Sequence, residues 1–87
     1  MKRDVDRYYR TASLPLAIYL YAKDQQIAGI DVVSDSGKKE FAFVFTPYLE
    51  EIVELYKFGE RTDPNLLVPV HLYERARNEL LDRLNGN

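Results

Sequence analysis

The stretch IAGIDVVSDSGKKEFAFVF, residues 27–45, constrains the fold more than any other part of the chain. Two apolar runs flank a polar segment with a glycine, and this pattern predicts a β-hairpin. A two-residue turn at Ser36 and Gly37 gives a register that gathers six apolar side chains on one face, in the pairs Val32–Phe41, Ile30–Phe43 and Ala28–Phe45.

A third strand is expected before the hairpin, because an isolated two-stranded hairpin is only marginally stable. Residues 6–11, DRYYRT, have strand composition, and Tyr8 and Tyr9 would point to opposite faces of a sheet. A right-handed crossover leaves room between the first two strands for residues 41–45, FAFVF, which form the most continuously apolar strand. The sequence therefore predicts an α+β fold in the order β-α-β-β-α-α, with a three-stranded split βαβ sheet and helices packed on one face.

Three further apolar patterns predict helices, at 14–23, 47–58 and 69–84. Ser13 and Thr46 are suitable N-cap residues, and a proline follows each of them in the first turn. Gly59 is expected to end the second helix in a left-handed conformation. The pattern contains no repeats, so we expect residues 1–87 to form a single domain.

The composition favours a binding protein over an enzyme. The chain has no cysteine and a single histidine, His71, with no metal-binding spacing and no glycine-rich phosphate loop. We therefore expect no catalytic residue, metal, cofactor or small-molecule substrate. Asp4 and Asp6 argue against a secretion signal, and the apolar stretch after Ser13 is too short to span a bilayer. A cytoplasmic location without membrane binding is expected.

Charge placement suggests a protein-interaction or regulatory module as the first hypothesis. The net charge is -2, and the second predicted helix carries an acidic face formed by Glu50, Glu51 and Glu54. These carboxylates would bind a protein partner, or imitate phosphate groups in an inhibitor of a host system. The outer sheet face, with Gly29 and Ala42, offers a second surface for a partner or for a dimer.

The alternative hypothesis is a nucleic-acid-binding accessory protein. Its binding residues would be basic or aromatic, namely Arg7, Tyr8, Tyr9, Arg10, Lys38 and Lys39. Arginine pairs with phosphate and a tyrosine ring stacks on a base in proteins that bind single-stranded nucleic acid. The acidic total charge disfavours this alternative. The residues leave open the partner, the oligomeric state and which of the two adjacent tyrosines is exposed.

The string YYRTASLPLAIYLYAKDQQIAGIDV, followed by FAFVF, resembles a family of small single-domain proteins of unknown function. Its members share a signature similar to YYRT-SLPLA-YLY and occur in bacteria, archaea, viruses and mobile elements. Members often have glycine after the first helix, where this chain has Asp24. The resemblance implies a fold and an accessory or inhibitory role in a mobile element, and it carries no catalytic residues.

Overall fold

The computed structural model describes residues 8–32, 37–60 and 62–86, and its elements follow the predicted order. Along the chain they are β1 (Tyr8–Thr11), α1 (Leu14–Ala22), β2 (Ile27–Val32), β3 (Lys39–Val44), α2 (Pro47–Phe58), the short 3₁₀ helix η2 (Pro64–Leu66) and α3 (Val70–Gly86). The α+β fold predicted from the sequence is therefore confirmed, and the last helix ends two residues beyond its predicted end.

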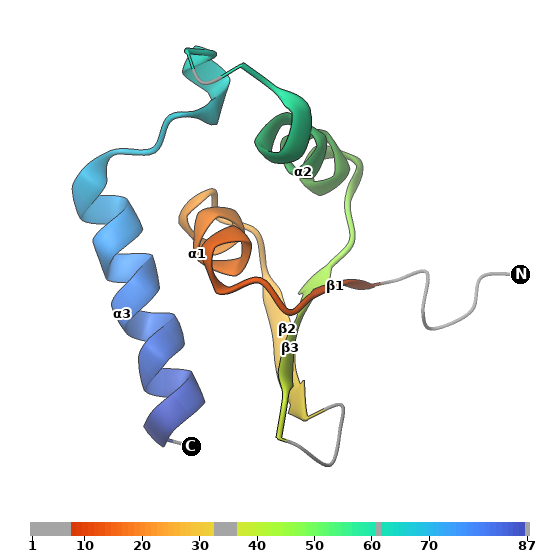
Figure 1. Ribbon diagram of the computed structural model, residues 1–87, viewed down its shortest axis with the longest axis vertical. Helices are drawn as coiled ribbons and strands as arrows, with labels where there is room; N and C mark the ends of the chain where they lie inside the picture. Colours follow the sequence, from red (N-terminus) through yellow and green to blue (C-terminus); the bar gives the residue numbers. More distant parts are fainter. Residues whose placement is uncertain (1–7, 33–36, 61, 87) are drawn as a thin grey trace, which may run out of the picture.

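The three strands form one sheet in the order β1-β3-β2, and both neighbours run antiparallel to β3. The central strand is the apolar one, since Phe41 and Phe43 are buried against the helices. β1 and β2 are therefore parallel to each other with β3 between them, which is the predicted split βαβ arrangement. Helix α1 lies between the sheet and α3, and α2 lies beside α1 (Figure 1).

The register between β2 and β3 differs from the predicted one. Val32 pairs with Lys39, and Ile30 pairs with Phe41, instead of with Phe41 and Phe43 respectively. The difference is two residues along β3. Side chains alternate between faces with a period of two, so this offset keeps Ile30 and Phe41 on the same side of the sheet.

A β-bulge near the start of β2 changes the faces of its first residues. Ile27 pairs with Phe43 and Gly29 with Ala42, so one residue on β2 is extra. Ile27 consequently packs against the core, whereas Ala28 is exposed and lines a hollow on the opposite face. The prediction that Ala28 faces the core was wrong, because regular alternation cannot anticipate the extra residue.

Glycine was expected at the hairpin turn, as Gly37, and at the end of the second helix, as Gly59. Gly37 has a φ of 83°, a left-handed value that glycine adopts without strain, while its predicted turn partner Ser36 lies outside the described residues. Gly59 has a φ of -75°, so the left-handed conformation predicted for it was wrong. Its small size matters for another reason, because a Cβ atom there would collide with the backbone oxygen of Leu55.

The ends of α1 explain how this apolar helix is placed in the centre of the fold. The Ser13 hydroxyl accepts a hydrogen bond from the backbone N–H of Leu16 at 3.3 Å, which caps the first turn. Asp24 follows the helix with a φ of 66°, a conformation that aspartate tolerates better than most residues. Between these ends, all five residues from Leu16 to Leu20 are buried, as predicted for a helix covered on more than one side.

The other two helices cover α1 with narrower apolar stripes. Thr46 caps α2, which buries Leu49, Ile52 and Val53. Helix α3 contributes Ala76 and Leu80 to the same core cluster. Within the described residues, the helices are too short or too polar to cross a membrane.

Candidate functional site

The face of the sheet opposite the helices is left uncovered by the described residues, and β1 contributes its side chains to both faces. Tyr9 packs against the core, whereas Tyr8 and Arg10 lie on the outer face, where they line a hollow of about 180 Å³. The two adjacent tyrosines therefore lie on opposite faces, as predicted, and both side chains are half-buried. Arg7, which also belongs to the predicted basic and aromatic group, lies outside the described residues.

Arg10 on the outer face is already paired. Its guanidinium lies 2.8 Å from a carboxylate oxygen of Asp31, so the ion pair spans the central strand from β1 to β2. Ala42 of β3 is the cross-strand partner of Arg10 and is only 4% exposed. Asp31 also lies directly opposite Glu40. Arg10 therefore offsets a local excess of negative charge, which leaves it less available to a phosphate group.

The two lysines near the hairpin tip do not join this group. The Lys39 ammonium donates a hydrogen bond to the backbone oxygen of Leu84 at 3.0 Å, near the C-terminal end of α3. Cations are favoured at that end of a helix because the helix dipole is negative there. Lys38 is exposed, and no contact ties it to Arg10. The structure thus brings together Tyr8 and Arg10 and directs Lys39 towards the helices.

The three carboxylates predicted on the second helix are exposed on α2. Glu50, Glu51 and Glu54 lie within little more than one turn, and Glu51 also lines a cavity between α2 and the connection that follows it. Among the described residues, no group of three metal-binding side chains is close enough to hold a metal ion. All three carboxylates are exposed, and Glu51 differs from the other two because it also lines this cavity.

This α2 cavity has a volume of about 350 Å³. It is lined by Lys23, Tyr48, Glu51, Ile52, Leu55, Asp63 and Asn65. The four α2 residues, at positions 48, 51, 52 and 55, lie on one side of the helix, because residues three or four positions apart are neighbours on a helix surface. The opposite wall comes from the connection, where the Asp63 side chain accepts a hydrogen bond from the Asn65 backbone N–H at 2.9 Å and starts η2. The cavity therefore combines carboxylates, an aromatic ring and apolar side chains.

Tyr19 of α1 connects the α2 cavity to the core. Its ring centroid lies 5.1 Å from that of Tyr56, and its hydroxyl donates to the backbone oxygen of Asn65 at 3.4 Å. Burial raises the pKa of Tyr19, and the neighbouring Tyr48 and Asp63 raise it further. The Lys23 ammonium lies 5.8 Å from the Tyr19 ring centroid and donates to Asn65 at 2.8 Å. The face of the Tyr19 ring and the Asn65 carbonyl oxygen thus hold the Lys23 ammonium at this site.

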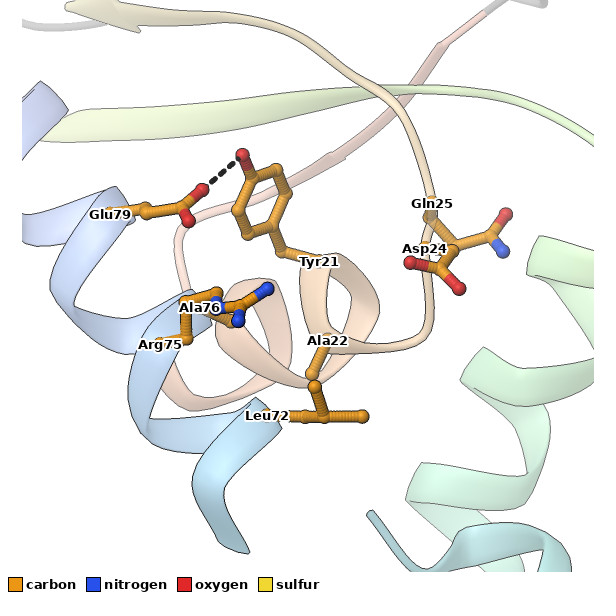
Figure 2. A pocket seen from close by; sticks show the side chains of 8 residues that line it. All are labelled: Tyr21, Ala22, Asp24, Gln25, Leu72, Arg75, Ala76 and Glu79. Carbon is orange, nitrogen blue, oxygen red and sulfur yellow. Dashed lines mark hydrogen bonds between the residues drawn. The ribbon is translucent and has the colours of Figure 1, made fainter. Parts of the chain in front are cut away.

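A second cavity, of about 310 Å³, lies between the end of α1 and α3 (Figure 2). The Tyr21 hydroxyl donates to a Glu79 carboxylate oxygen at 2.8 Å, and this hydrogen bond, followed by burial, raises the pKa of Tyr21. Arg75 and Asp24 also line the cavity. The Tyr21–Glu79 bond joins the two helices, so the clearest role of this region is to hold α3 against α1.

No family model, curated protein or solved structure matches this chain. The family resemblance noted from the signature therefore stays a prediction.

Sequence reasoning found the acidic face but missed the α2 cavity. Glu51 was a candidate, whereas Asp63 and Tyr48 were assigned no binding role. The cavity depends on how the connection at 59–69 folds back against α2, and that long-range contact has no signature in the sequence. The Asp63-Pro64 pair, a common start of a short turn, is the one local signal that points to it.

Proposed function

We propose that this protein is a non-enzymatic interaction module that binds another protein chain through α2 and the connection after it. The observation that supports this proposal is the location of the large hydrophobic side chains that are exposed to solvent. Seven such side chains are exposed among the described residues: Tyr48, Tyr56 and Phe58 on α2, Leu67 in the connection after it, Val70 at the start of α3, and Val32 and Phe45 in the hairpin segment. Four of the seven belong to α2 and the connection after it, and exposed apolar side chains that form a continuous patch are typical of an interaction surface.

The chemistry of these residues supports the same proposal. Tyrosine and phenylalanine are enriched at protein interfaces because they bury a large area at a small cost in side-chain entropy. Tyr48 is 51% exposed and Phe58 is 77% exposed, although both belong to a helix whose other side is buried in the core. Glu50 and Glu54 on the same helix would supply a polar rim.

Affinity capture from native cells, followed by binding measurements with the purified partner, tests this function. We expect the double substitution Tyr48→Ala with Phe58→Ala to weaken binding by at least about tenfold, as is common for aromatic interface residues. Sedimentation velocity at increasing concentration would show whether the partner is a second copy of the chain. Circular dichroism checks that the variants are folded.

Gly29→Glu is the matched control, because it places a charged side chain on the outer sheet face, where a Cβ atom meets nothing within 4 Å. If Gly29→Glu abolishes binding and the α2 variant does not, the interface is the outer sheet face and the proposal for α2 is wrong. If no captured protein binds the purified chain, the proposed function itself fails. An accessory or inhibitory role in a mobile element, and a cytoplasmic location, stay predictions.

A further inference from the structure

We propose that the α2 cavity binds the guanidinium group of an arginine in a basic segment of the protein partner. This inference rests on the proposed function, because it names the chemistry that the α2 surface would recognise. Three features of the cavity support it: the charge of its lining, the aromatic ring of Tyr48 and the cation that the chain itself places there.

The first feature is the charge of the cavity walls. Glu51 extends from α2 and Asp63 lies in the connection opposite, so carboxylates line the cavity from two separate elements. Neither forms an ion pair with the described residues, among which Arg10–Asp31 is the sole salt bridge. Lys23 is the one cation among the described lining residues, so these residues together carry an excess of one negative charge. A positive group is attracted there, and a phosphate group is repelled.

The second feature is the aromatic surface. The Tyr48 ring lines the cavity and is half exposed, so one part of it is free to contact a ligand. A guanidinium group stacks on aromatic rings and is less strongly hydrated than an ammonium group. Its planar donors also pair with a carboxylate through two parallel hydrogen bonds. Tyr48 and Glu51 lie three residues apart on α2 and therefore share one side of the helix, where they can offer both contacts to one arginine.

The third feature is Lys23, which shows how this region already holds a cation. Its ammonium donates to the Asn65 carbonyl oxygen and lies over the face of the Tyr19 ring. Among the described residues, no carboxylate lies within ion-pair distance of it. Among the described residues neither Glu51 nor Asp63 forms an ion pair, and one Asp63 oxygen accepts the Asn65 N–H, so both carboxylates can still contact a second cation. The cavity volume of about 350 Å³ is large enough for a side chain from a partner.

The test is a ¹H–¹⁵N correlation NMR titration of the full chain with N-acetyl-arginine amide. We expect saturable shifts of the backbone signals of Glu51, Ile52 and Asp63. N-acetyl-citrulline amide has nearly the same shape without the charge, and it should produce much smaller shifts. Glu51→Gln should weaken the arginine compound by about two- to fivefold, the effect expected for one exposed charge pair.

Glu54→Gln is the matched control, since it removes the same charge from an exposed position of α2 that does not line the cavity. Equal weakening by Glu51→Gln and Glu54→Gln would show general charge attraction and would overturn the proposal. Equal shifts with the citrulline compound, or shifts centred elsewhere, would overturn it as well. If the purified partner loses affinity on Tyr48→Ala with Phe58→Ala but not on Glu51→Gln, the function holds and the arginine inference fails.

Discussion

Replacement of Leu80 by alanine offers the most direct test of how α3 is held in the fold. The Leu80 side chain is 0% exposed and belongs to the core cluster that joins α3 to α1. Removing a fully buried leucine side chain to the β-carbon costs about 3–5 kcal/mol, through lost burial and the cavity that is left. The total stability of a domain of this length is about 4–13 kcal/mol, so we expect a large loss.

Leu67→Ala is the matched control, because it makes the same chemical change at a side chain that is 61% exposed. We expect this variant to stay within about 0.5 kcal/mol of the wild type. Urea unfolding followed by circular dichroism measures the free energy of unfolding of both variants. In a thermal melt, each 1 kcal/mol of lost stability should lower the melting temperature by about 4–8 °C in a domain of this size. If Leu80→Ala costs no more than Leu67→Ala, α3 is not packed on α1 as described.

Three further predictions concern side-chain contacts and can be tested on the same purified chain. A double-mutant cycle on Arg10 and Asp31, measured by urea unfolding, should give a coupling energy of about 0.2–1 kcal/mol, because these side chains are 41% and 54% exposed. A coupling energy well above this range would contradict the exposed geometry of the ion pair. The hydrogen bond to Glu79 raises the pKa of Tyr21 above its ordinary value of 10.0 in the folded chain. As the pH rises, the unfolded chain therefore loses the Tyr21 proton before the folded chain does. The free energy of unfolding should consequently fall as pH rises above 10.0. Tyr21→Phe should reduce that fall in urea titrations at about pH 9 and about pH 11, and an unchanged fall would rule out this contribution. Titration of the chain into labelled single-stranded DNA or RNA should give no saturable anisotropy change at about 50 mM salt, because Arg10 is paired and Lys39 faces the helices. Binding that is abolished by Arg10→Ala would support the nucleic-acid alternative instead.

The strand order could be predicted from the sequence, whereas the register between β2 and β3 could not. Residues 41–45 are the most apolar strand, and a strand with neighbours on both sides is the one that needs such composition. The observed pairing of Ile30 with Phe41 and the predicted pairing with Phe43 place the same side chains on the same face. Hydrophobic alternation therefore cannot distinguish two registers that differ by two residues, and only the geometry of the connection decides between them.

The candidate site was predictable only in part, for a similar reason. The exposure of Glu50, Glu51 and Glu54 follows from their position opposite the apolar stripe of α2. The pairing of Arg10 with Asp31 depends on which residues the sheet brings to one face, and the α2 cavity depends on contacts across the connection to Asp63. Charged groups on separate elements are related only through tertiary structure, which local patterns do not contain.

The central place of β3 has a consequence for how the chain folds as it is synthesised. β1 and β2 are complete early, yet neither can form sheet hydrogen bonds with the other because β3 lies between them. The pair Tyr8–Val44 must close a long loop, and such non-local pairings slow folding. Until Val44 has left the ribosome, the apolar α1 has no complete sheet to cover it. The nascent chain would then expose its most apolar helix, which makes this interval the stage at which aggregation or chaperone binding is favoured.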